Sequence, residues 1–115
     1  MQISFKDWQR KLNEPKIKHP CIDKLAQLLD EANVPYTRNP IWTGEQIRVG
    51  ELCDAICHEF SYGNESDLLE IQGALTNEEL KEKPDYILGC LTPEEVAKRF
   101  IYCYRNNTKI YKEEV

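Results

Sequence analysis

Glycine is scarce in this sequence, and the commonest phosphate-binding and hydrolase motifs are missing with it. Only five glycines occur among the 115 residues. None of them forms a GxxxxGK loop, a GxGxxG turn or a GxSxG elbow. In the first two patterns backbone amides bind phosphates, and in the third a strained turn exposes a nucleophilic serine. Their absence argues against the usual nucleotide-dependent enzymes and against serine hydrolases of the elbow type.

Long apolar runs are missing too. No stretch approaches the roughly 18 apolar residues of a membrane span, and residues 1–10 lack the apolar centre of a secretory signal peptide. The five cysteines are an odd number at irregular spacing, which argues against a secreted disulfide framework. We therefore expect a cytoplasmic protein with free thiols and no membrane partner.

The chain does contain enough apolar material for one core. Hydrophobic residues make up 41% of it, and a chain of this length buries about two thirds of the surface that its unfolded form exposes. This composition predicts one small domain over residues 1–115. It gives no prediction of the oligomeric state.

The formal charge of −5 hides an uneven distribution along the chain. Residues 1–44 carry seven basic and five acidic side chains, residues 45–95 carry three and thirteen, and residues 96–115 carry five and two. The central segment is therefore strongly acidic and would repel the phosphates of a nucleic acid. This argues against direct nucleic-acid binding and favours a protein partner with a basic surface.

Three segments have the capping and spacing of helices. Ser4 begins a capping box and is followed by apolar residues at helical spacing, which predicts a helix over about 4–13. Pro20 suits the first turn of a second helix that ends before the strands. Thr92, followed by proline and two glutamates, predicts a C-terminal helix over about 93–106.

Residues 34–75 alternate short β-favouring runs with turn formers, which predicts a small, mainly antiparallel sheet. Residues 52–60 fit a helix or a strand, and the turn formers after them favour a strand. Residues 69–72 also favour a strand, although a short helix fits them. The expected fold is α+β, with two N-terminal helices over 1–33, and with a loop and a C-terminal helix, packed on the sheet, over 76–115.

Apolar positions of these elements make up the predicted core. They are Trp8, Leu12, Ile22, Leu25, Leu29, Ile47, Ile56, Phe60, Leu69, Ile71, Val96 and Phe100. The environment of four other aromatic residues is left open, and any of them that is exposed would mark a contact surface. These are Trp42, Tyr62, Tyr102 and Tyr111.

Cysteine and histidine offer few combinations for a metal or for catalysis. Cys53, Cys57 and His58 form one local cluster, but a structural zinc site commonly uses two close pairs of ligands, and no second pair is present. Cys21 follows His19 closely, but neither this pair nor the adjoining Cys57 and His58 has the geometry expected of a cysteine nucleophile and its base. We therefore expect buried structural cysteines, no metal, no cofactor and no catalytic residues.

Carboxylates of the acidic segment are the candidate partner-binding residues. An acidic face that docks into a basic groove speeds association and occupies a site meant for nucleic acid. The simpler interpretation is that the acids keep a small protein soluble. The residues expected to bind the partner are Glu65, Asp67, Glu78, Glu79, Glu82 and Asp85.

A small-ligand site is the alternative. The loop over residues 61–66 has a hydroxyl, an aromatic ring and backbone amides that suit a small polar ligand. A tight polar connection between strands explains the same loop without a ligand. The residues of this alternative site are Trp42, Arg48, Tyr62 and Asn64.

Three segments together resemble a known group of proteins. They are SYG at residues 61–63, LLEIQGALT at 68–76 and GCLTPEEVAKR at 89–99. In this order they are similar to small uncharacterised proteins encoded by phages and prophages of Gram-positive bacteria. Cys90 and Ala97 depart from that pattern, in which an aromatic and a larger residue are more usual. The resemblance implies an accessory protein made during infection and implies no particular site.

The resemblance and the acidic segment together predict a non-catalytic inhibitor of a bacterial antiphage defence enzyme. An example is an anti-CRISPR protein whose acidic face occupies the nucleic-acid-binding groove of an RNA-guided nuclease. One alternative is a protein that sequesters a nucleotide immune signal in a pocket. Another is a non-catalytic accessory of phage replication or packaging that bridges phage proteins.

Overall fold

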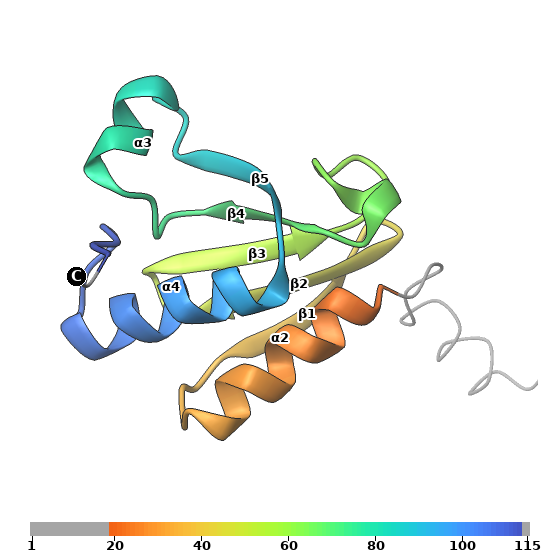
Figure 1. Ribbon diagram of the computed structural model, residues 1–115. Helices are drawn as coiled ribbons and strands as arrows, with labels where there is room; N and C mark the ends of the chain where they lie inside the picture. Colours follow the sequence, from red (N-terminus) through yellow and green to blue (C-terminus); the bar gives the residue numbers. More distant parts are fainter. Residues whose placement is uncertain (1–18, 114–115) are drawn as a thin grey trace, which may run out of the picture.

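The computed structural model describes residues 19–113. Figure 1 shows five strands in one sheet, with two long helices side by side on one face of it. The elements are α2 (Pro20–Glu31), β1 (Thr37–Ile41), β2 (Gly44–Val49), β3 (Cys53–Cys57), a 3-10 helix η1 (Asn64–Ser66), β4 (Leu69–Gln72), α3 (Asn77–Glu82), β5 (Ile87–Leu91) and α4 (Pro93–Asn106). Within this part of the chain, no helix has the length and apolar character needed to cross a membrane.

The sheet is an antiparallel meander, because each strand pairs with the next one in the sequence. A two-residue turn at Trp42 and Thr43 joins β1 to β2. The register of β2 on β3 places Glu45 opposite Cys57. The pairing of β4 with β5 is irregular, and Cys90 on β5 has a φ of 61°. The sheet therefore has regular hairpins on one side and a kinked edge strand on the other.

The α+β class, the antiparallel sheet and the C-terminal helix are confirmed. α4 spans the predicted residues, and the hydroxyl of Thr92 accepts the N–H of Glu95 at 3.2 Å as an N-terminal cap. α2 begins at Pro20, as its sequence predicts. The helix predicted over 4–13 lies outside the described residues, so of the two N-terminal helices only the second is seen.

The sheet continues further along the chain than the sequence predicts. Residues 52–60 and 69–72 contain strands β3 and β4, as favoured, but α3 and β5 occupy a region expected to be loop. α3 has a complete capping box, in which Thr76 and Glu79 each accept the backbone N–H of the other. β5 was missed because Gly89 and the left-handed Cys90 interrupt its apolar residues.

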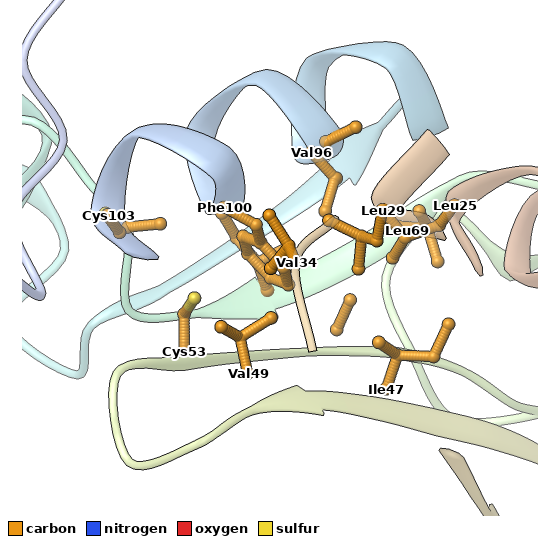
Figure 2. Packing of buried hydrophobic residues seen from close by; sticks show 14 of the residues in the cluster. Leu25, Leu29, Val34, Ile47, Val49, Cys53, Leu69, Val96, Phe100 and Cys103 are labelled. Atoms are coloured by element: carbon orange, nitrogen blue, oxygen red, sulfur yellow. The ribbon is translucent and has the colours of Figure 1, made fainter. Parts of the chain in front are cut away.

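The core lies between the sheet and the helices α2 and α4 (Figure 2). β3 turns alternate residues inward, so Cys53, Ala55 and Cys57 are buried. Eight predicted core residues are at most 1% exposed. They are Ile22, Leu25, Leu29, Ile47, Leu69, Ile71, Val96 and Phe100.

Two predicted core residues are not in the core. Ile56 is half-buried because the alternation along β3 turns it to the face opposite Ala55. Phe60 is 66% exposed, because β3 ends at Cys57 and the chain turns away from the sheet. The remaining two, Trp8 and Leu12, lie outside the described residues.

Candidate functional site

Large aromatic side chains are exposed at one end of the sheet. Trp42 lies at the tip of the β1–β2 hairpin, and Phe60 and Tyr62 lie in the loop that follows β3 (Figure 1). Their exposed fractions are 69%, 66% and 67%. Exposed aromatic side chains of this size are enriched at protein interfaces, where they anchor the partner. This end of the molecule is therefore the candidate contact surface, whereas Tyr111 is buried.

The hairpin presents Trp42 in a conformation that bulky residues seldom adopt. Its φ is 54°, in the left-handed region, which costs an L-residue about 1 kcal/mol or more. The hydroxyl of Thr43 accepts the N–H of Glu59 at 2.9 Å and thereby ties the turn to the loop after β3. Next to it, Gly44 packs so closely on the carbonyl of Cys57 that an added Cβ would lie 1.8 Å from the oxygen. The closely packed turn therefore holds the indole of Trp42 in a position exposed to solvent.

The ring of His58 packs beside the rings of Trp42 and Phe60. The ring of Trp42 packs edge-on against Phe60 at 5.3 Å, and the His58 ring lies 6.3 Å from each of them. Nδ1 of His58 accepts the N–H of Phe60 at 3.1 Å. Ser61 closes the turn, because its hydroxyl accepts the N–H of His58 and donates to its carbonyl. Burial lowers the pKa of His58 and thereby favours the neutral ring.

Tyr62 fastens the loop to the opposite edge of the sheet. Its N–H donates to Glu70 on β4 at 3.0 Å, and its carbonyl accepts the N–H of Cys90 on β5 at 3.3 Å. Gly89 makes this possible, because a Cβ at that position would lie 2.4 Å from the Cβ of Tyr62. The loop from 58 to 68 is therefore anchored at several points along its length.

The six predicted partner-binding carboxylates do not form one group. Glu65 and Asp67 lie before β4, at the end that carries the exposed aromatics, whereas the other four lie on α3 or just after it, beyond the far end of β4 (Figure 1). Glu65 is exposed beside the aromatics, as is Glu59, which the prediction did not include. We call Trp42, Glu59, Phe60, Tyr62 and Glu65 the aromatic–acidic surface.

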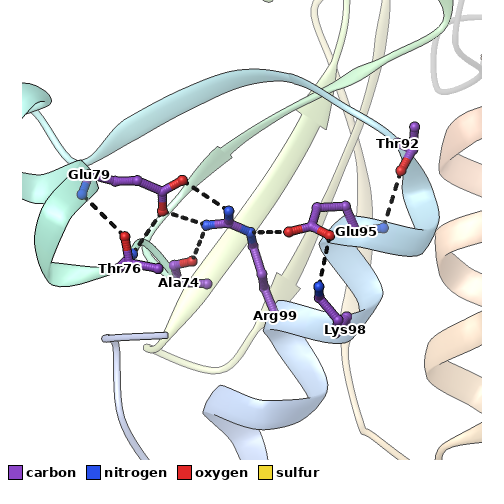
Figure 3. Close-up of polar contacts among 7 residues, drawn as sticks. All are labelled: Ala74, Thr76, Glu79, Thr92, Glu95, Lys98 and Arg99. Atoms are coloured by element: carbon purple, nitrogen blue, oxygen red, sulfur yellow. Dashed lines mark hydrogen bonds and ion pairs between the residues drawn. The ribbon is translucent and has the colours of Figure 1, made fainter. Parts of the chain in front are cut away.

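Two of the six carboxylates are bound within the protein. Asp67 accepts the N–H of Cys21 at 3.2 Å and so caps the start of α2. Glu79 accepts two hydrogen bonds from the buried guanidinium of Arg99 (Figure 3). The remaining members of the α3 group are exposed. These are Glu78, Glu82 and Asp85.

The alternative ligand residues are also divided between the two ends of the sheet. Arg48 lines a cavity of about 400 Å³ near the start of β3, together with Asp54, Tyr86 and Lys109. Trp42, Tyr62 and Asn64 do not line it. The amide of Asn64 donates to the carbonyl of Ser61 inside its own loop. The four residues therefore do not build one pocket.

A second cluster lies directly behind the aromatic–acidic surface. The ligand atoms of His19, Cys57 and Asp67 lie within 4.8 Å of one another. The thiol of Cys57 donates to the carbonyl of Leu68 at 3.5 Å, and the backbone N–H of Cys21 donates to Asp67. The zinc cluster considered from the sequence is not formed, since Nδ1 of His58 accepts the N–H of Phe60.

Sequence reasoning missed this cluster because its members are remote from one another in the chain. His19 precedes α2, Cys57 ends β3, and Asp67 follows η1. The fold brings the end of β3 close to the start of α2, and the loop after β3 returns to the same point. In the sequence Cys57 adjoins His58, whereas it comes close to His19 only in the folded chain.

Comparison with protein-family models, curated proteins and solved structures finds no significant match to this chain.

Proposed function

We propose that the protein acts by binding another protein, without catalysis, and that it inhibits a bacterial antiphage defence enzyme. The aromatic–acidic surface occupies a basic groove that otherwise holds nucleic acid, as in an RNA-guided nuclease. The observation that carries the proposal is the exposure of three large aromatics on one anchored hairpin and loop. The phage setting rests on the resemblance described from the sequence.

The chemistry of this surface favours a partner rich in arginine and lysine. Aromatic faces attract cations, and guanidinium groups stack on them. Glu59 and Glu65 add carboxylates at the rim, where charge steers association and sets its salt dependence. A groove that holds nucleic acid offers the matching cations, since phosphate contacts are made mainly by such side chains.

The test compares two matched pairs of charge-neutralising substitutions. Glu59→Gln with Glu65→Gln alters the aromatic–acidic surface, whereas Glu78→Gln with Glu82→Gln removes the same charge from α3. Binding to purified RNA-guided nucleases from Gram-positive hosts is measured by calorimetry over a range of salt concentrations. We expect the first pair to weaken binding and to reduce its salt dependence, and the second pair to leave both unchanged.

Two outcomes would overturn the proposal. If the α3 pair weakened binding and the first pair did not, the acidic group on α3 would be the docking site. If no nuclease bound the wild-type chain, and pull-down from infected cells recovered no nucleic-acid-binding protein, groove occupation would be wrong.

A second candidate function is supported by the cavity beside Arg48. Arg48 and Lys109 supply positive charge for a phosphate and Tyr86 an aromatic ring for a base, although Glu51 and Asp54 also line the cavity. Sequestration of a nucleotide immune signal would raise the melting temperature when cyclic nucleotides are added. We expect Arg48→Gln to abolish that shift. The absence of a shift over a panel of cyclic nucleotides would contradict this function.

A further inference from the structure

The cluster behind the aromatic–acidic surface has the donors of a transition-metal site. His19 offers an imidazole nitrogen, Cys57 a thiol and Asp67 a carboxylate, and their ligand atoms lie within 4.8 Å of one another. They come from three separate elements, so the fold itself collects them. Cys57 is completely buried, while His19 and Asp67 are half-buried.

One nitrogen in this cluster has no hydrogen-bond partner. Nε2 of His19 is buried, and no polar group of the described residues bonds to it. Buried polar groups in native proteins are almost always bonded, because leaving one without a partner costs its full desolvation free energy. A metal ion in the cluster would satisfy this nitrogen.

The start of α2 holds Asp67 in place. Cys21 lies in the first turn of α2, and its backbone N–H donates to Oδ1 of Asp67 at 3.2 Å. Asp67 can serve two groups at once, because Oδ1 accepts the N–H of Cys21 and the carboxylate has further lone pairs. Such hydrogen bonds to a ligating carboxylate hold it in orientation.

We propose that His19, Cys57 and Asp67 bind one Zn²⁺ ion, which leaves the fourth position of a tetrahedral site to a water molecule. A mixed nitrogen, sulfur and oxygen set suits zinc, whereas calcium and magnesium prefer oxygen alone. The ligand atoms of a tetrahedral zinc site lie about 3.5 Å apart, so any of the three that are farther apart than this draw together when the ion binds. Binding releases the thiol proton of Cys57 to solvent.

The site would fix the loop that carries the aromatic–acidic surface. Cys57 immediately precedes this loop, Asp67 lies near its end, and Phe60 and Tyr62 lie between them. A metal bound to both ligands crosslinks the two ends of the loop and lowers the conformational entropy of the loop. The metal proposal does not depend on the identity of any partner, because it concerns the free protein.

The test uses the full chain, reduced, stripped of metal and titrated with Co²⁺ in place of Zn²⁺. We expect one equivalent to give the intense visible bands of tetrahedral cobalt and a thiolate-to-cobalt charge-transfer band in the near ultraviolet. Added Zn²⁺ should abolish both, because it binds such sites more tightly than Co²⁺. A reduced chain that gives no such bands would overturn the proposal.

Several variants identify the ligands, so the assignment does not depend on any single substitution that could unfold the protein. His19→Gln and Asp67→Asn each should weaken Co²⁺ binding at least tenfold, and Asp67→Asn keeps an oxygen that can cap α2. Cys57→Ser should remove most of the charge-transfer intensity. Cys90→Ser is the matched control, because this cysteine is exposed and not part of the cluster.

Two results with these variants would contradict the site. Unchanged affinity in both His19→Gln and Asp67→Asn would show that the ion binds elsewhere. Equal loss of the bands in Cys90→Ser would show adventitious thiol binding.

Discussion

Arg99 and Glu79 form a two-point ion pair that joins α4 to α3. Nη1 of Arg99 lies 2.7 Å from Oε1 of Glu79, and Nη2 lies 2.9 Å from Oε2 (Figure 3). The same guanidinium donates to the carbonyl of Ala74 and to Glu95. Only 6% of the Arg99 side chain is exposed. The pair therefore fastens the segment that leaves β4 to the C-terminal helix.

Removal of this arginine is expected to destabilise the fold strongly. Arg99→Met should lower the free energy of unfolding by about 3 kcal/mol, because it leaves a partly buried carboxylate and a buried carbonyl without their donor. Urea unfolding followed by circular dichroism measures the effect. Lys98→Met is the control, since its ion pair with Glu95 is exposed and should contribute little. An effect of Arg99→Met no larger than the control would contradict the role assigned to the pair.

The same pair makes stability depend on pH. Hydrogen bonds from Arg99 lower the pKa of Glu79 below its ordinary value of 4.5. Since the folded-state pKa is the lower one, ionised Glu79 stabilises the fold at neutral pH, and this contribution is lost as the pH falls through the folded-state pKa. Glu79→Gln should therefore destabilise the protein at pH 7, and the difference from wild type should shrink in acid.

Urea unfolding of both proteins at several values between about pH 7 and pH 3 measures this difference directly. Subtracting one curve of unfolding free energy against pH from the other cancels the contributions of the other carboxylates, because these titrate in both chains. A difference that stays constant down to pH 3 would show that the Glu79 carboxylate is not stabilised by its charge.

Gly44 is expected to tolerate no side chain. An added Cβ would lie 1.8 Å from the carbonyl oxygen of Cys57, and that oxygen belongs to the backbone of a paired strand that cannot move aside. Gly44→Ala should therefore prevent folding or separate β2 from β3, as seen by loss of amide protection in hydrogen exchange. Gly50→Ala is the control, because its φ of 53° costs about 1 kcal/mol but nothing lies within 4 Å. Equal stability of the two variants would contradict the close contact.

The elements with strong local patterns are the ones that the sequence predicts. α4 has a threonine cap, a proline in its first turn and an apolar stripe, and its predicted bounds agree with the structure. β5 has no such pattern, because Gly89 and the left-handed Cys90 are accommodated by contact with Tyr62 from a distant loop. The six-residue α3 has a capping box but too few residues to show a periodic face.

The candidate site was predicted only in its exposed parts. Trp42 and Tyr62 were named as residues whose exposure would mark a surface, and both are exposed. Asp67 and Glu79 were grouped with the surface acids, although each binds a group far away in the chain. Composition indicates how many charges a chain carries, but the fold decides which of them are neutralised inside it.

Trp42 is expected to contribute to binding more than to stability. Its left-handed backbone suits asparagine far better than tryptophan, but its indole also packs on Phe60 at 5.3 Å, and such a pair contributes about 1 kcal/mol. In wild type the two effects of Trp42→Asn should nearly cancel. In a Phe60→Ala background the aromatic pair is already absent, so Trp42→Asn should raise the free energy of unfolding by about 1 kcal/mol.

The decisive measurement is urea unfolding of the four chains in this double-mutant cycle, together with partner binding by each. Trp42→Asn should weaken binding in either background while it stabilises only the chain that lacks Phe60. If it destabilised both backgrounds equally, the indole would be a structural residue of the hairpin and not the anchor of an interface. That result would also remove Trp42 from the residues expected to anchor the partner.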